Sequence, residues 1–166
     1  GSYGVEWVWS APAGVAYTKS EATVGQYEAC VKAGRCGRDT FQSTNDGGKY
    51  CSWGSSRGGS HPMNCVNWSG AQAFCEAVGG TLPSEAQWFA EASNGNTRQF
   101  PWGDLGVTCD LAVMNNGTDG CGRDSTWPVC SKPRGHSVSG LCDMSGNVWE
   151  WTSDSDSAER VLRGGS

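Results

Sequence analysis

The sequence has only two histidines, no Cys-x-x-Cys pair, no excess of basic residues and no long hydrophobic run. Both histidines, His61 and His136, are flanked by Pro or Gly, so we expect them in loops rather than at a metal. The net charge is −5 and the pI is near 4.9, so nothing attracts a phosphate backbone and no nucleic-acid partner is expected. No apolar stretch approaches the length of a membrane-spanning helix, so we expect no membrane span.

The 166 residues instead carry 25 Gly, nine Trp and nine Cys. This length fits one domain with a real core, so residues 1–166 are interpreted as a single domain. The Gly and Trp content excludes both disorder and a helical bundle, and it favours short strands and loops around an aromatic core. Nine Cys without zinc-finger spacing predict disulfides, and therefore an oxidising location that is extracellular, on the cell surface or periplasmic. Because nine is odd, at least one thiol lacks a partner within the chain.

Three segments have the pattern of short helices. Capping-box spacing at Thr23–Gln26 precedes a helix over about 24–32, and the same spacing at Ser84–Gln87 opens a helix that ends at Asn94–Gly95. Between them, a helix capped by Asn67 or Ser69 stops at Gly79–Gly80. The apolar side of the third helix is expected to consist of Trp88, Phe89 and Ala92.

The rest of the chain alternates between short strands and long loops. Alternating residues within 1–19 and in the segment 160–166 predict strands. Residues 37–60 and 105–139 are rich in Gly, Ser, Asn and Asp, so long loops are expected there. The predicted class is therefore α+β, with two or three short helices around small antiparallel sheets.

The segment Gly140–Trp151 concentrates two Trp, two carboxylates and a tight turn within twelve residues. On a strand, Trp149 and Trp151 point to one face and Glu150 to the other, where a carboxylate beside large aromatics is costly to bury without a partner. With Asp143 and the turn carbonyls nearby, this arrangement indicates a hard cation, most plausibly calcium. The competing interpretation is a solvated Glu150 on an edge strand.

Six blocks of this chain, in order, resemble the formylglycine-generating enzyme (sulfatase-modifying factor) family, a branch of the C-type lectin fold. They are Glu21–Tyr27, Asn64–Cys75, Leu82–Trp88, Phe100–Asp104, Gly140–Trp151 and Arg160–Ser166. The resemblance runs from about Glu21 to the last residue, and it implies a disulfide-rich α+β domain of that fold.

The resemblance also implies a structural calcium ion at the Gly140–Trp151 segment. Carried across residue by residue, the ligands are the side chains of Asp143 and Glu150 and the carbonyls of Gly146 and Val148. A second family calcium site uses an Asn and an Asp in the preceding loop. Its candidates here are Asn115, Asn116, Asp119 and Asp124, which the loop spacing does not allow us to align.

Enzymes of this family oxidise a sulfatase Cys to formylglycine with a copper-binding Cys pair that follows the Arg-Gly-Gly-Ser block. In this chain Ser166, which matches the family's active-site Ser, is the final residue, and none of the nine Cys occupies the positions of that pair. The chain as given is therefore expected to have no oxidase activity, and copper is expected only if a Cys pair exists beyond it. The family's closing strands would also lie beyond Ser166, so we expect another segment or chain to complete the fold.

In family enzymes the Cys that matches Cys75 pairs with one near the C-terminal strand, which would account for the odd count. The alternative is that Cys75 is a buried free thiol. The other eight would then pair locally as Cys30–Cys36 and Cys51–Cys65, with two bridges among Cys109, Cys121, Cys130 and Cys142. Four Cys allow three connectivities, of which we predict Cys109–Cys121 and Cys130–Cys142.

Two classes of function follow. The first is a non-catalytic extracellular domain that binds or displays a protein or surface ligand, as adhesins and the variable proteins of diversity-generating retroelements do on this scaffold. The second is the N-terminal part of a formylglycine-generating oxidase or a related sulfatase-modifying enzyme. The local Cys within 30–142 favour the first class, because they suit a rugged extracellular domain and are not needed for the enzyme chemistry.

Overall fold

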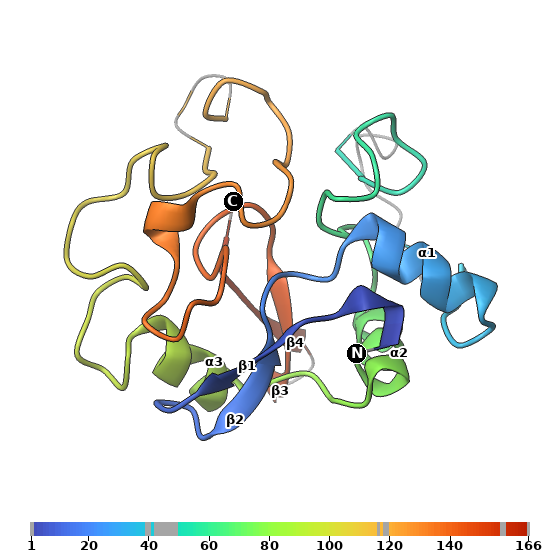
Figure 1. Cartoon of the computed structure of the whole chain (residues 1–166), viewed down its shortest axis with the longest axis horizontal. Helices are drawn as coiled ribbons and strands as arrows, with labels where there is room; N and C mark the ends of the chain where they lie inside the picture. The colour runs from blue at the N-terminus through green and yellow to red at the C-terminus, as the bar shows by residue number, and fades with distance from the viewer. Residues whose placement is uncertain are drawn as a thin grey trace.

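The computed structural model describes residues 2–38, 41, 50–115, 117, 120–156 and 159–165. These residues form two separate two-stranded sheets and three α-helices joined by long loops, as Figure 1 shows. The elements are β1 (Trp7–Ser10), β2 (Val15–Thr18), α1 (Val24–Lys32), α2 (Trp68–Val78), α3 (Glu85–Ala92), β3 (Glu150–Asp156) and β4 (Glu159–Arg163). Short 3-10 turns lie at Ser2–Gly4 and Pro133–Gly135.

Each helix begins where its capping residue predicts. Thr23 and Ser84 form complete capping boxes with Gln26 and Gln87, so two otherwise unbonded donors are satisfied at the start of α1 and of α3. The Asn67 side chain accepts from the Gly70 N–H and caps α2, which ends at Gly79 in a left-handed conformation. None of these helices, across the part of the chain that the structure describes, is long and apolar enough to cross a membrane.

Both sheets are antiparallel hairpins. In β1–β2, Trp7 pairs with Thr18 and Trp9 with Ala16, and the side chains of Trp7 and Trp9 are 40% and 64% exposed. The β3–β4 hairpin pairs Glu150 with Arg163 and has an irregularity between Trp151 and Ser155. α3 contacts both β3 and β4, so this hairpin is held against the third helix.

Two apolar clusters form the core. The first joins α1 to α2 around Tyr27 and Phe74, whose rings stack with centroids 5.9 Å apart. The second packs Trp88 and Ala92 of α3 against Leu141 and Met144. In Figure 1, α1 and α2 lie to the right, while the loops of about residues 100–135 occupy the left and top of the molecule.

The prediction for the buried side of α3 was wrong in one respect. Phe89 is 50% exposed, whereas Glu91 is only 2% exposed. Trp88, Glu91 and Ala92 follow the i, i+3, i+4 spacing of one helix face, and Phe89 falls outside it. The Glu91 carboxylate tolerates burial because it accepts hydrogen bonds from the hydroxyls of Ser10, Ser137 and Ser139.

Four disulfides staple the loops. They join Cys30 to Cys36, Cys51 to Cys65, Cys109 to Cys121 and Cys130 to Cys142, which are the four pairs that the sequence analysis proposed. Cys75 on α2 is the free cysteine. It lines a cavity of about 870 Å³ between the two clusters, together with Tyr17, Phe74, Trp88 and Trp151.

Candidate metal centre

The turn before β3 is built from unusual backbone. Asp143, Gly146 and Asn147 all have positive φ, at 57°, 96° and 67°. At Gly146 only glycine fits, because a Cβ there would lie 2.2 Å from the carbonyl oxygen of Val113. That carbonyl accepts the Asn147 N–H at 2.7 Å, so the turn is pressed against the 111–115 segment.

The Asn147 side chain ties this turn to two remote segments. Its Oδ1 accepts the backbone N–H of Trp127 at 3.0 Å, and its Nδ2 donates to the Trp127 carbonyl at 3.2 Å. The same Nδ2 donates to Oε2 of Glu21 at 2.8 Å. Asn147 is 4% exposed, so these bonds are shielded from water and fix the turn geometry.

Asp143 is the first predicted ligand, and it is 7% exposed. Its Oδ2 accepts the Cys130 N–H at 2.6 Å. Burial raises the pKa of Asp143 above its ordinary value, although the Cys130 N–H and the electrostatic interactions with His136 and Lys132 act in the opposite direction. An acid with this pKa gains from a cation placed beside it.

Glu150, the second predicted ligand, is the first residue of β3. Its Oε2 accepts the Trp88 indole N–H at 2.5 Å. Burial raises the pKa of Glu150 to about 7, the Trp88 hydrogen bond opposes this, and the charge of Asp143 adds to it. Because Glu150 is partly exposed, the calcium ligand and the solvated glutamate both stay predictions. The expected strand geometry is also wrong at Trp149, which precedes the strand and is 58% exposed.

Sequence reasoning missed a third carboxylate, that of Glu21. Its Oε1 accepts the Val148 N–H at 3.2 Å, and its Oε2 accepts from Asn147. Burial raises the pKa of Glu21 well above its ordinary value, and the charges of Asp143 and Glu150 raise it further. No local spacing links Glu21 to a turn more than 120 residues later, although both lie in blocks that resemble the family.

The structure does not bring one oxygen each of Glu21, Asp143 and Glu150 within 4.8 Å of one another. Glu21 accepts its hydrogen bonds from Asn147 and Val148 of the turn itself. A Cβ on Gly164 would lie 3.1 Å from the Val148 carbonyl oxygen and 3.7 Å from Glu150 Cγ, so this close approach of the chain after β4 depends on glycine. Oxygen-only donors with buried negative charge fit a hard cation such as calcium.

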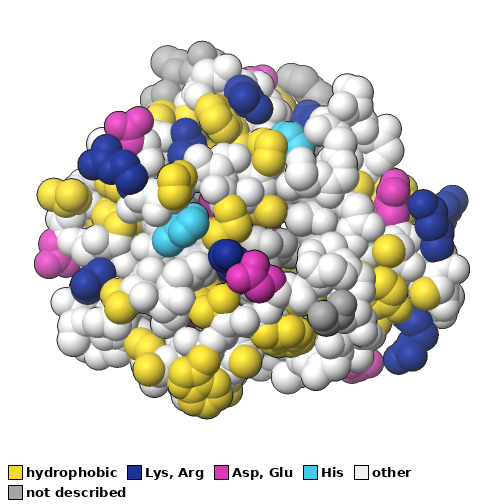
Figure 2. Space-filling view, in the orientation of Figure 1, with side chains coloured by type: hydrophobic (Ala, Val, Ile, Leu, Met, Phe, Trp, Pro, Cys, Tyr) yellow, Lys and Arg dark blue, Asp and Glu magenta, His cyan; other side chains and the backbone are white. Residues whose placement is uncertain are grey.

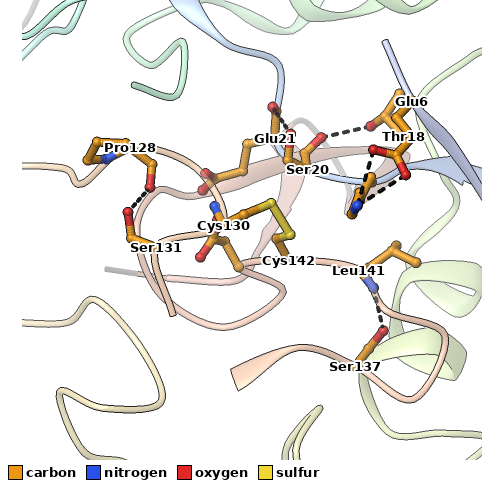
Figure 3. Close-up of a disulfide and its surroundings, with 12 residues drawn as sticks. Glu6, Thr18, Ser20, Glu21, Pro128, Cys130, Ser131, Ser137, Leu141 and Cys142 are labelled. Carbon is orange, nitrogen blue, oxygen red and sulfur yellow. Dashed lines mark hydrogen bonds and ion pairs between the residues drawn. A yellow bond between two sulfur atoms is a disulfide. The ribbon is translucent and has the colours of Figure 1, made fainter. Parts of the chain in front are cut away.

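Of the other predicted site residues, Asn115 and Asp124 are described by the structure, and no contact with the turn is seen for either. Asn115 Oδ1 accepts the Gly117 N–H at 2.9 Å within its own loop. Asn116, Asp119 and Ser166 lie outside the described residues, so the second calcium site and the family's active-site Ser stay predictions. Figure 3 shows the Cys130–Cys142 bridge, which joins the segment of Ser131 to that of Leu141 immediately before Asp143.

The fold and this turn define a small, disulfide-stapled α+β domain of the C-type lectin-like type. Residues 11–166 match the model of the sulfatase-modifying factor enzyme 1-like domain. The chain therefore belongs to that family. This match confirms the resemblance drawn from the six sequence blocks.

Among curated relatives, the chain is 35% identical over 136 residues to the formylglycine-generating enzyme of Streptomyces coelicolor, which covers 64% of this chain and 42% of that protein. It is 38% identical to the formylglycine-generating enzyme of Mus musculus, over 57% of this chain and 27% of that one. It is also 38% identical to the hercynine oxygenase of Mycolicibacterium thermoresistibile, over 55% of this chain and 20% of that one. The chain thus spans less than half the length of these relatives.

Among solved structures, Treponema denticola variable protein 1 superimposes with a TM-score of 0.58. The match covers 97% of this chain and 80% of the other at 18% sequence identity, so it establishes the fold and nothing more. The fold alone does not fix the function of this chain.

Proposed function

We propose that the chain is a non-catalytic extracellular domain that presents its loops to a protein or surface ligand. The observation that carries this proposal is the placement of the disulfides. Each closes a loop of the chain itself, with sequence separations of 6, 14, 12 and 12 residues, rather than linking distant parts of the domain. Local staples rigidify loops before a ligand arrives, which lowers the entropic cost of binding.

The long loops that carry or adjoin these disulfides offer contact area. Tyr50, Leu105, Val107 and Val138 lie in irregular segments and are 38–65% exposed. Figure 2 shows hydrophobic side chains scattered among charged ones over the face that carries these long loops, without one continuous apolar patch. This arrangement favours a ligand that contacts several loops over a ligand that binds in a single apolar groove.

A formylglycine-generating role is the second candidate, and the named relatives favour it. Within this chain, eight of the nine Cys are engaged in disulfides. Burial raises the pKa of Cys75 to about 11, so it is a neutral thiol and a poor ligand for copper. An oxidase would therefore have to take its copper thiolates from residues outside these 166.

We also propose a structural calcium ion at the turn, held by the side chains of Asp143 and Glu150 and by the carbonyls of Gly146 and Val148. Calcium would supply positive charge that offsets the mutual repulsion of the buried carboxylates. Its support is the raised pKa of Glu21, Asp143 and Glu150, together with the close approach of Gly164 to Val148. The ion would hold the loop frame and take no part in chemistry.

One experiment separates the two functions. The natural full-length protein is incubated with copper, oxygen and a peptide that carries a sulfatase-type Cys, and the peptide is analysed by mass spectrometry. In parallel, the protein is screened on arrays of glycans and surface proteins. We expect an unchanged peptide and a specific ligand; conversion of the peptide Cys to formylglycine would overturn the proposal.

A matched pair of variants then locates the binding surface. Leu105→Ala combined with Val107→Ala truncates an exposed loop, whereas Phe89→Ala truncates a similarly exposed side chain on α3. Binding should weaken at least about tenfold in the loop variant and stay unchanged in the helix variant, as hot-spot side chains dominate affinity. Equal weakening in both variants would contradict a loop-based binding face.

A further inference from the structure

The Cys130–Cys142 disulfide has a histidine beside it. The two sulfur atoms and a ring nitrogen of His136 all lie within 4.8 Å of one another. Among the residues that the structure describes, this is the one group of three His, Cys, Asp or Glu side chains gathered so closely. The Cys109–Cys121 bridge, which spans the same sequence separation of 12, has no such neighbour.

One ring nitrogen of His136 is buried without a hydrogen bond. Its Nε2 is shielded from solvent and has no hydrogen-bond partner, which is unusual for a buried polar atom. The second histidine behaves differently, since a ring nitrogen of His61 lies 2.9 Å from the Thr126 hydroxyl. The imidazole of His136 is thus placed beside two sulfurs with a ring nitrogen left unsatisfied.

The surroundings favour a positive ion. Asp143 follows Cys142 directly, is 7% exposed and accepts the Cys130 N–H, so a buried carboxylate lies against the sulfur pair. Cys142 is 2% exposed, whereas Cys130 is partly exposed, so an external reagent reaches the pair from the Cys130 side. Two thiolates and a neutral imidazole are the donor set that zinc takes up in proteins.

We propose that Cys130, Cys142 and His136 form a redox-gated zinc site. A dithiol reductant transfers two electrons and two protons to the disulfide, which becomes two thiols while the reductant is oxidised to its own disulfide. Zinc then displaces one proton from each thiol and is held by two thiolates and one His136 nitrogen, with the fourth position left to water. Because both states use the same sulfurs, the disulfide and the bound metal exclude each other.

The required movement is small. Zinc–sulfur bonds of ~2.3 Å and zinc–nitrogen bonds of ~2.0 Å place tetrahedral ligand atoms roughly 3.5–3.8 Å apart. The ring nitrogen already lies within 4.8 Å of both sulfurs and must approach by about 1 Å. The sulfurs, 2.03 Å apart in the disulfide, must move apart by about 1.7 Å after reduction. The zinc site would share no ligand with the proposed calcium site, although Asp143 follows Cys142 directly and accepts the Cys130 N–H. It does not rest on the proposed function.

The test measures zinc binding to the full chain before and after reduction, by dialysis against chelator-buffered zinc, with cobalt as a spectroscopic probe of thiolate ligands. We expect no uptake by the oxidised chain and one equivalent after reduction, with a thiolate-to-cobalt charge-transfer band. His136→Ala should weaken binding by at least about tenfold, since even outer-sphere partners are worth that much. His61→Ala and the pair Cys109→Ser with Cys121→Ser should leave binding unchanged.

A second variant avoids reductant altogether and keeps the other three bridges. Cys130→His removes the disulfide and offers two imidazoles and the Cys142 thiol, so it should bind zinc in the oxidised protein more tightly than Cys130→Ser. Equal zinc binding by these two variants would overturn the proposal. So would undiminished binding in reduced His136→Ala, or loss of binding in the Cys109 and Cys121 double variant, which would place the metal elsewhere.

Discussion

At the residue scale, the carboxylates of Glu91 and Glu150 have different sets of partners. Glu91 is surrounded by three serine hydroxyls, whereas Glu150 has one indole donor and the like charge of Asp143 nearby. The hydroxyls satisfy the Glu91 carboxylate without a metal, whereas a cation would offset the like charges of Glu150 and Asp143. The contrast explains why a cation is proposed at the turn before β3 and not beside Glu91.

Removing the Glu91 carboxylate should destabilise the fold. Glu91→Ala leaves the buried hydroxyls of Ser10 and Ser137 without their acceptor, which costs about 1–3 kcal/mol or more in the free energy of unfolding. Glu76→Ala, on the exposed side of α2, is the matched control and should change stability by less than about 0.5 kcal/mol. Urea denaturation of both variants gives the comparison; equal stability would refute a structural role for Glu91.

Alanine substitutions at Gly146 and Gly140 distinguish the cost of steric crowding from the cost of backbone strain. Both have positive φ, but a Cβ on Gly140 meets nothing within 4 Å, whereas one on Gly146 would collide with the Val113 carbonyl. Gly140→Ala should cost about 1–2 kcal/mol of strain. Gly146→Ala should cost about 1–3 kcal/mol more, because the turn must move. Thermal unfolding measures the difference, and equal losses would mean that the turn is not pressed against Val113.

The raised pKa of Glu150 predicts how stability depends on pH in the metal-free chain. Between 4.5, its ordinary value, and about 7, the folded state binds more protons than the unfolded state, so stability falls as pH rises through this window. The slope from one group is at most about 1.4 kcal/mol per pH unit. Glu21 and Asp143 act in the same direction.

The measurement is urea denaturation in chelator from below pH 4.5 to above pH 7. Glu150→Gln cannot titrate, so its slope should be shallower than that of the wild type across the same window. Glu76→Gln, which changes an exposed carboxyl, serves as the control. A wild-type slope of the opposite sign would contradict the assigned burial of these acids.

At the scale of elements, the helices follow local chemistry closely. α1 and α3 begin where the Thr23 and Ser84 capping boxes predict, because each box satisfies backbone donors at the start of its helix. The four disulfide pairs also match the prediction. Local rules therefore account for the frame of the domain.

The features that the sequence did not predict depend on tertiary contacts. Hydrophobicity placed Phe89 inside and gave no sign that Glu91 is buried, because the burial of Glu91 depends on serines 46 to 81 residues away in sequence. Glu21 was overlooked for the same reason, since its partner Val148 is 127 residues away. A buried carboxylate is recognised only when its partners are known, and no spacing in the sequence reveals them.

The cap of α3 offers a direct test at this scale. Ser84→Ala removes the acceptor of the Gln87 N–H and should cost about 1 kcal/mol of stability. Ser69→Ala, at an exposed position in the first turn of α2, loses only a hydroxyl contact to the Asn67 side chain and should cost less than about 0.5 kcal/mol. Chemical denaturation distinguishes them, and a reversed order would show that the α3 cap is not used.

At the scale of the whole molecule, two small cores and four staples support long loops, and one turn connects them. The turn before β3 reaches Val113, Trp127 and Glu21, which lie in three separate parts of the chain. A cation at this turn would therefore stabilise the entire loop frame. The proposed calcium ion would thus hold in place the loops that are proposed to bind a ligand.

The measurement that tests it most directly is a calorimetric calcium titration of the full chain, paired with thermal unfolding with and without calcium. The wild type should bind calcium and unfold at a higher temperature in its presence, because the ion binds only the folded state. Glu150→Ala should lose both effects, whereas Glu76→Ala, with its exposed carboxyl, should keep them. Equal calcium binding by the wild type and Glu150→Ala, or no calcium effect on wild-type unfolding, would contradict the assignment of this turn as the metal centre.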